Sequence, residues 1–135
     1  MGNASKIIIN NINKMIFYIA AHSQEDAKKV AKLCIDAGHT VNSRWILEDF
    51  SRTSSYTDVD KTNIAHIDYD DVVAADALIL LSSPFRIPGG KFVEVGIALA
   101  SHMPVYLLGH RENMLMWHIS VQQFDSAENL LKYLA

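Results

Sequence analysis

The sequence predicts a three-layer α/β/α domain built on a five-stranded, mainly parallel sheet, and three observations support this fold class. Short apolar runs rich in β-branched and aromatic residues recur along the chain, as is typical of buried strands. Helical stretches separate these runs, and strands that alternate with helices form parallel sheets covered on both faces. The chain has 135 residues, 50% of them hydrophobic and 20% charged, which suits one domain with its own core.

The first half of the chain is predicted to supply two strands and one helix. Residues 15–20 form an apolar run that predicts the first strand. Ser23 begins a helix with a capping-box-like start, and Gly38 is expected as the glycine that follows its end. Residues 40–47 predict a second strand, and the polar, turn-rich residues 50–60 predict a surface loop.

The second half continues the alternation. It is expected to contain helices over residues 61–74 and 91–101, strands over 77–82, 104–108 and 121–124, and a last helix capped by Ser126 that runs through Leu134. Right-handed crossovers between five such strands favour the flavodoxin-like or Rossmann-like order 2-1-3-4-5, with ligands beyond the carboxyl ends of the strands. We expect residues 15–135 to form this single domain and residues 1–14 to be an N-terminal extension.

Composition argues against several classes of partner. The net charge is −3, and no basic stripe is present to bind a phosphate backbone. The single cysteine, Cys34, cannot form an internal disulfide or a zinc cluster, which favours a reducing, cytoplasmic location. Apolar stretches such as residues 74–81, broken by Asp76, are far shorter than the about 20 residues of a membrane span. The six histidines show no metal-binding pair at i, i+4 spacing, so we expect no metal site.

Residues at the predicted carboxyl ends of the strands are the candidates for ligand binding. They are Ala20, His22, Arg44, Ser82, Gly89, Gly90, Asn113, Met114 and Trp117. No glycine-rich phosphate signature is present, although the pair Gly89 and Gly90 opens a helix whose backbone N–H groups could hold an anion.

Glu94 is the most informative residue of the chain. It lies within residues 92–100, a helix that is apolar on nearly every side and is therefore predicted to be buried. A buried carboxylate must be compensated. One interpretation is an acid near the helix start that the backbone amides and the helix dipole stabilise. The other is a nucleophile or general base at the ligand crevice.

Asp68 and Tyr18 are the other candidates. Asp68 follows Ile64 by four residues and so shares its inward face, where a carboxylate could accept hydrogen bonds from a nucleobase edge or pair with Arg44 or the backbone. Tyr18 lies in an interior strand, and its hydroxyl could reach the crevice or bond locally.

Four segments together resemble the nucleoside 2-deoxyribosyltransferase family, including the related 2′-deoxynucleoside 5′-phosphate N-hydrolases. They are residues 16–20, Asp68 with residues 76–80, residues 89–99 and residues 112–117. The Glu-x-Gly-x-Ala-Leu element that begins at Glu94 is the most specific of them, and the resemblance runs from about residue 15 to the end.

The resemblance implies a mechanism and a set of partners. Glu94 would attack the anomeric carbon of a 2-deoxyribosyl group, Asp68 would bind and help to protonate the leaving base, and Tyr18 would orient the nucleophile. A second base or water would then resolve the glycosyl-enzyme intermediate. The substrates would be a small deoxynucleoside or deoxynucleotide and a nucleobase, without a cofactor. Family members are usually dimers or larger, with an asparagine near Asn113 reaching a neighbouring site.

Two departures from the family pattern keep alternatives open. Pro88 stands where family transferases often have an acid, and the chain ends soon after its last helix. Residues 43–46 and Arg86 could serve a 5′-phosphate, which would favour hydrolysis of deoxynucleoside 5′-monophosphates. The sequence therefore predicts base exchange, with nucleotide hydrolysis or a non-catalytic nucleotide-binding module as alternatives.

Overall fold

The computed structural model describes residues 14–85 and 89–135, and the predicted fold class is confirmed. The strands are β1 (Ile16–Ala20), β2 (Thr40–Val41), β3 (Ala77–Leu81), β4 (Val105–Leu108) and β5 (Val121–Phe124). The helices are α2 (Gln24–Asp36), α3 (Asp58–Ala74), α4 (Gly90–Ala100) and α5 (Ala127–Leu134), with 3₁₀ segments η1 (Arg44–Leu47), η2 (Phe50–Ser55) and η3 (Met114–Trp117). The strands pair in parallel in the order β2-β1-β3-β4-β5.

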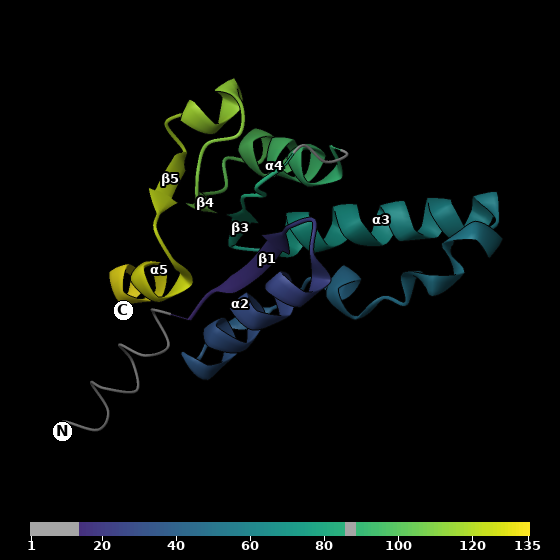
Figure 1. Cartoon of the computed structure of the whole chain (residues 1–135), viewed down its shortest axis with the longest axis horizontal. Helices are drawn as coiled ribbons and strands as arrows, with labels where there is room; N and C mark the ends of the chain where they lie inside the picture. Colours follow the sequence, from purple (N-terminus) through teal and green to yellow (C-terminus); the bar gives the residue numbers. More distant parts are fainter. Residues whose placement is uncertain (1–13, 86–88) are drawn as a thin grey trace.

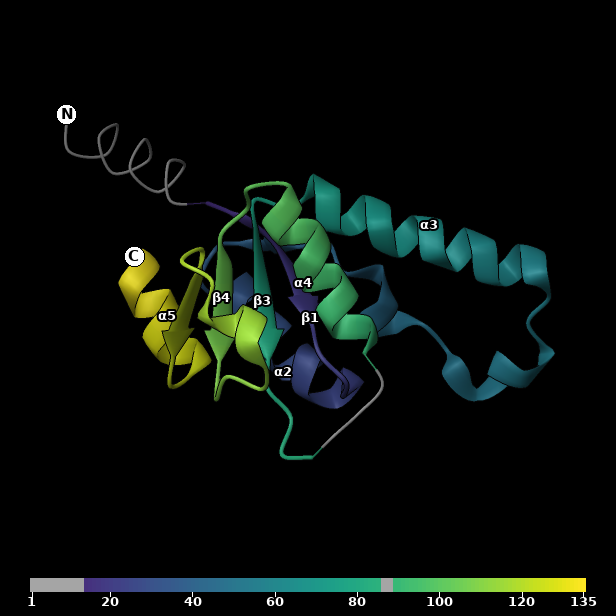
Figure 2. The same ribbon diagram turned by 90° about the horizontal axis from the view of Figure 1, so that it is seen from above.

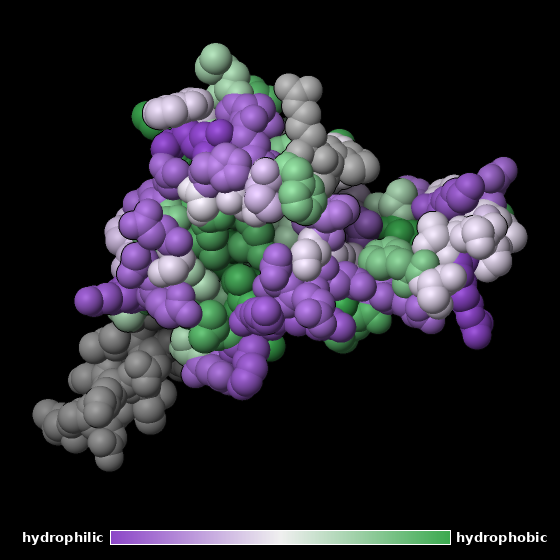
Figure 3. Space-filling model, in the orientation of Figure 1, coloured by the Kyte–Doolittle hydropathy of each residue, from purple (hydrophilic) through white to green (hydrophobic). Residues whose placement is uncertain are grey.

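The sheet lies between two helical layers, with α3 and α4 on one face and α2 and α5 on the other (Figure 1). Side chains along β1 alternate between the layers, as a strand with period two requires. Tyr18 and Ala20 pack towards α3 and α4, whereas Phe17 and Ile19 pack towards α2 and α5. In Figure 3, apolar surface shows at the centre of the drawn face, over the strands, and hydrophilic side chains surround it. The sheet therefore carries a core on each face.

The predicted helix caps are present at several helix ends. The Ser23 hydroxyl accepts a hydrogen bond from the backbone N–H of Asp26, and the Ser126 hydroxyl accepts one from Asn129. Gly38 follows α2 with a φ of +96°, and the N–H of His39 bonds to the carbonyl of Cys34. This pattern is a Schellman motif, in which glycine is favoured because its φ is positive.

The prediction for the second strand was wrong beyond its first two residues. Only Thr40 and Val41 pair with β1, and the chain then turns into η1. Ser43 explains the change, because its hydroxyl accepts the N–H of Ile19 at 2.7 Å and takes the place of a ladder carbonyl. The Gln24 side chain then holds backbone carbonyls in and after η1.

The predicted loop over residues 50–60 also needs correction. It contains η2, and α3 begins at Asp58, three residues before the predicted start. A reciprocal capping box between Thr57 and Asp60 fixes this earlier start. Figures 1 and 2 both show α3 reaching beyond the edge of the sheet, together with η2. The inner half of α3 is the part that borders the sheet and α4.

Some predictions concern residues that the structure does not describe. The expected extension over residues 1–14 lies, up to residue 13, outside the described residues, as do Arg86 and Pro88. Among the helices of residues 14–85 and 89–135, none has the length and apolar character needed to cross a bilayer.

Candidate functional site

Tyr18 and Glu94 meet at the centre of the candidate site. Tyr18 is fully buried in β1, and its hydroxyl donates a hydrogen bond to Oε2 of Glu94 on α4. Val95 and Ala98 on α4 pack in the same core cluster as Tyr18, so the helix is fixed over the strand. The sequence placed Glu94 near the first helical turn, but α4 begins at Gly90 and that turn holds no acid. The partner of the carboxylate is a side-chain hydroxyl.

Burial controls the protonation of this pair. Burial raises the pKa of Glu94, the Tyr18 hydrogen bond opposes the rise, and nearby Asp68 adds a smaller increase, so that the pKa lies at about 7. Burial and the neighbouring Glu94 also hold the pKa of the Tyr18 hydroxyl well above its ordinary value. The phenol is therefore a neutral donor, and the carboxyl of Glu94 is poised between its two forms near neutral pH.

Asp68 lies across the same cavity, on α3. Burial raises the pKa of Asp68, the charges of Asp71 and Glu48 raise it further, and Arg44 opposes them. A carboxyl group whose neutral form is favoured can donate a proton as well as accept one. Among the described residues, no side chain forms a hydrogen bond with this carboxyl group, which leaves it available to a ligand.

Arg44 is engaged by Asp71 rather than by Asp68. Its Nη2 lies 2.8 Å from Oδ1 of Asp71, and its Nε and backbone N–H bond to the same carboxylate. The sequence interpretation in which Arg44 would pair with Asp68 is therefore wrong. Asp71 is 6% exposed, so this pairing compensates a buried charge one helical turn beyond Asp68.

The cavity between α3 and α4 has a volume of about 410 Å³. It is lined by Ala21, Trp45, Phe50, Ala65, Asp68, Tyr69, Gly90, Lys91, Val93, Glu94 and Ile97. Trp45 belongs to η1, and its indole N–H is held by the carbonyl of Ile19 at 2.8 Å. Apolar and aromatic walls around two carboxyl groups suit a flat, uncharged heterocycle.

Other predicted binding residues lie elsewhere. Those that do not line this cavity are Ala20, His22, Arg44, Ser82, Gly89, Asn113, Met114 and Trp117. Ala20 is buried in the core, His22 is exposed before α2, and Gly89 is the N-cap residue of α4. Ser82 supports the loop after β4, because its hydroxyl accepts the N–H of His110 at 3.2 Å.

The residues around η3 form a separate exposed surface. Asn113 caps η3 by accepting the N–H of Leu115, while Met114 and Trp117 are exposed. The Arg111 guanidinium lies 4.1 Å from the ring of Trp117, a cation–π contact that orients the indole. These residues do not line the cavity that contains Glu94 and Asp68, so they could act in the site only through contacts made outside that cavity.

The sequence interpretation missed Lys91 as a lining residue, and it considered Trp45 only within residues 43–46, as a segment that could serve a 5′-phosphate. Trp45 was hidden because residues 40–47 had the composition of a strand, and the turn into η1 brings its indole to the cavity. One sequence feature could have indicated Lys91: it is the single cation at the start of a mostly apolar helix. Among the residues that the structure describes, no group of three or more His, Cys, Asp or Glu side chains has the arrangement of a metal site.

The fold and the site define a class of α/β proteins whose carboxyl groups line a crevice beyond the carboxyl ends of parallel strands. The family model described as nucleoside 2-deoxyribosyltransferase matches residues 15–131. The chain therefore belongs to the nucleoside 2-deoxyribosyltransferase family, which confirms the resemblance seen in the sequence. Membership supports an activity of the deoxyribosyltransferase or N-glycosidase type on small-molecule nucleosides and bases.

Solved structures share this fold. A 2-deoxyribosyltransferase from the psychrotolerant bacterium Bacillus psychrosaccharolyticus aligns with a TM-score of 0.68 at 22% identity, over 87% of this chain and 91% of its own. The CMP N-glycosidase of Clostridium botulinum gives 0.60 at 16% identity, over 88% and 97%. A conserved protein from Enterococcus faecalis V583 gives 0.61 at 21% identity, over 90% and 97%. No curated protein sequence matches this chain.

Proposed function

We propose that the protein cleaves the N-glycosidic bond of 2′-deoxynucleosides and transfers the 2-deoxyribosyl group to a second nucleobase. The observation that carries this proposal is the cavity in which Glu94, held by Tyr18, and Asp68 face the same space. One carboxyl group is oriented by a neutral donor, and the other has no partner among the described side chains. This is the asymmetry that a nucleophile and a proton donor need.

Glu94 acts as the nucleophile. Its ionised carboxylate attacks the anomeric carbon, a C–O bond forms, and the N-glycosidic bond breaks with its electron pair going to the base nitrogen. Positive charge develops on the sugar ring in the transition state, and a nearby carboxylate stabilises it. The product of this half-reaction is a glycosyl ester on Glu94 and a free base.

Asp68 donates and then accepts the proton of the base. Its protonated carboxyl donates to the departing base, so that the base leaves neutral. In the second half-reaction a new base attacks the anomeric carbon and gives a proton to Asp68, while Glu94 departs as a carboxylate. Protons and charges therefore return to their starting positions after one exchange.

A base-exchange assay tests the proposal. The protein is incubated with a deoxynucleoside and a second nucleobase, and the products are separated by chromatography. A new deoxynucleoside indicates transfer, whereas free base and free sugar indicate hydrolysis. A parallel reaction with a deoxynucleoside 5′-monophosphate, read for free base and sugar phosphate, tests the nucleotide hydrolase; tight nucleotide binding without product would indicate a binding module.

Glu94→Gln is the decisive variant, because it keeps the shape of the side chain and removes its charge. We expect complete loss of exchange, together with loss of the acid-quenched covalent adduct that we expect mass spectrometry to detect in the parent. Glu25→Gln, at an exposed position in α2, is the matched control. Exchange by the Glu94 variant at the parent rate would rule out the mechanism.

We also propose that the protein acts as a homodimer or a dimer-based oligomer. Four exposed apolar side chains gather in and after η3, namely Met114, Leu115, Trp117 and Ile119. Exposed apolar patches on soluble domains mark interaction surfaces, and a second copy would bring Asn113 near a neighbouring site. Sedimentation velocity of the parent and of Trp117→Ser tests this, and a monomeric parent would contradict it.

A further inference from the structure

Lys91 is a buried cation that spans the carboxyl-end edge of the sheet. It is the second residue of α4, and its side chain is 1% exposed. Its ammonium lies 3.0 Å from the carbonyl of Leu81, 3.2 Å from the hydroxyl of Ser83 and 2.8 Å from Oε2 of Glu112. A buried charge must be compensated. Here the partners come from the end of β3, the loop after it and the loop after β4.

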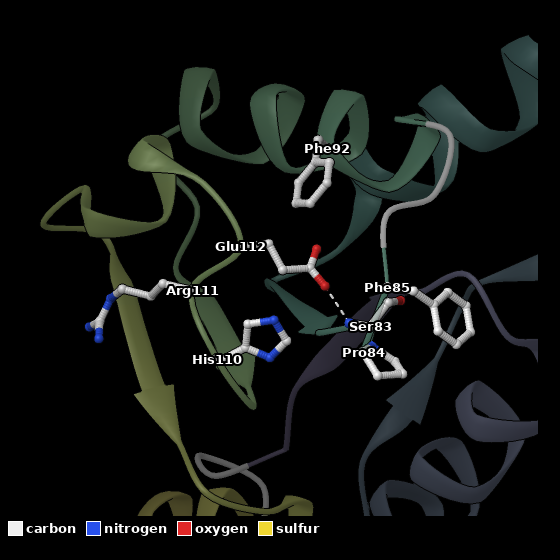
Figure 4. Close-up of a pocket in the computed structure, with 7 residues that line it drawn as sticks. All are labelled: Ser83, Pro84, Phe85, Phe92, His110, Arg111 and Glu112. Atoms are coloured by element: carbon white, nitrogen blue, oxygen red, sulfur yellow. Dashed lines mark hydrogen bonds between the residues drawn. The ribbon is translucent and has the colours of Figure 1, made fainter.

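Glu112, in the loop after β4, is the anionic partner of Lys91. Its carboxylate is 15% exposed and also accepts the backbone N–H of Ser83, the bond drawn as a dashed line in Figure 4. The Glu112 side chain points towards Ser83, whereas the neighbouring Arg111 points away (Figure 4). Asn113, the cap of η3, follows directly. The ion pair therefore joins α4 to the segment that carries η3.

The two residues of the pair line different cavities. Lys91 lines the cavity that contains Glu94 and Asp68, while Glu112 and Ser83 line a second cavity of about 350 Å³ beyond β3 and β4. Lys91 precedes Glu94 by three residues, so the two side chains leave the same face of α4 one turn apart. Anchoring Lys91 thus anchors the helical turn that leads to Glu94.

We propose that Lys91 and Glu112 are positioning residues, whose ion pair locks the first turn of α4 against the end of β3 and the loop after β4 and so sets where the Glu94 carboxylate meets the anomeric carbon. The inference rests on the proposed function of Glu94. Neither residue touches the reacting atoms. A displacement of about 1 Å at a reacting group costs about 10²-fold in rate, so the pair acts on turnover more than on binding.

Three variants test the proposal: Lys91→Met, Glu112→Gln and the double variant. We expect kcat to fall about 10- to 100-fold in each single variant, with KM within about threefold of the parent. The double variant should be about as slow as the slower single variant, because one interaction is lost in all three. If Lys91→Met does not fold, Glu112→Gln still tests the proposal.

Lys32→Met is the matched control, since Lys32 pairs with Asp36 at 2.9 Å on the surface, with side chains 77% and 59% exposed. We expect it to leave kcat unchanged. A purely structural ion pair would lower the melting temperature of the Lys91 and Glu112 variants without changing kcat per folded molecule. That result would overturn the proposal.

Amide hydrogen exchange separates this inference from the proposed function, because it needs no turnover. The N–H groups of Phe92 and Val93 bond to the carbonyl of Gly89 in the first turn of α4. Faster exchange of these amides in Glu112→Gln supports the anchoring role even if the parent shows no base exchange. Unchanged exchange overturns it even if the parent is an active transferase.

Discussion

Replacing Tyr18 with phenylalanine removes one oxygen from the site and leaves the buried ring in place. The Tyr18 hydroxyl is the donor to Glu94, and this hydrogen bond lowers a pKa that burial otherwise raises. A hydrogen bond to an ionised group contributes about 1.5–3 kcal/mol, and one pKa unit corresponds to about 1.4 kcal/mol. Tyr18→Phe should therefore raise the pKa of Glu94 by about 1–2 units from its value of about 7.

The rate at neutral pH follows from this shift. With a pKa of about 7, about half of Glu94 is ionised at pH 7. After the substitution the ionised fraction falls to between about one in ten and one in a hundred, so exchange at that pH slows about 5- to 50-fold. Because Glu94, the proposed nucleophile, must be ionised to react, the acid limb of the rate profile should move to higher pH, and activity should recover as pH rises.

Initial rates of base exchange, measured between about pH 5 and about pH 9 at saturating substrate, test the prediction. Tyr133→Phe, at an exposed position on α5, is the control and should keep the parent profile. An acid limb that stays in place or moves to lower pH would refute the reasoning. Equal loss at every pH would show that Tyr18 acts through placement and not through the ionisation of Glu94.

Three further predictions follow from the same contacts. The folded-state pKa of Glu94 lies above its ordinary value of 4.5, so wild-type protein loses up to about 3 kcal/mol of stability as pH rises from about 4.5 to about 7. Glu94→Gln lacks this loss, and its advantage in melting temperature should therefore grow between about pH 5 and about pH 8. Asp68→Asn removes the proposed proton donor and should slow exchange about 10²- to 10⁴-fold. The effect should be much smaller for a base that leaves readily without protonation, which comparison of two leaving bases would show. Arg44→Ala leaves the buried Asp71 carboxylate without its bidentate partner and should lower the denaturant midpoint of unfolding, and an unchanged midpoint would contradict that.

The sheet order was predictable because it depends on patterns that are local in the sequence. Each strand is a short apolar run, and right-handed crossovers leave few ways to connect five of them. Residues 40–47 show where this reasoning fails, since their composition suits a strand in any context. The Ser43 hydroxyl ends the pairing by bonding to a residue 24 positions earlier, and no local pattern contains that contact.

Thr57 and Asp60 are a different case, because the signal for the start of α3 was present in the sequence. Their spacing matches a capping box, and the structure shows both of its hydrogen bonds. The polar composition of residues 50–60 outweighed this signal in the prediction.

The residues of the candidate site likewise fall into those whose signal was present in the sequence and those whose partners were not. Glu94 and Asp68 were visible as acids on apolar helix faces, whereas the partners of Arg44 and Lys91 depend on contacts between distant segments.

Helix α4 carries one buried charged side chain, Lys91, and one half-buried charged side chain, Glu94, and the contrast between them is itself an argument for function. Lys91 is compensated by Glu112 and by two further oxygen atoms. Among the described residues, the carboxylate of Glu94, one turn later, receives a hydroxyl group and no cation, and burial raises its pKa to about 7. A carboxylate that served only the fold would gain stability from a cationic partner, as Lys91 gains it from an anionic one. Without a cationic partner among the described residues, Glu94 costs the fold stability near neutral pH, and perturbed groups of this kind cluster at functional sites. The contrast therefore supports the proposals that Lys91 anchors the helix and that Glu94 is the reactive group.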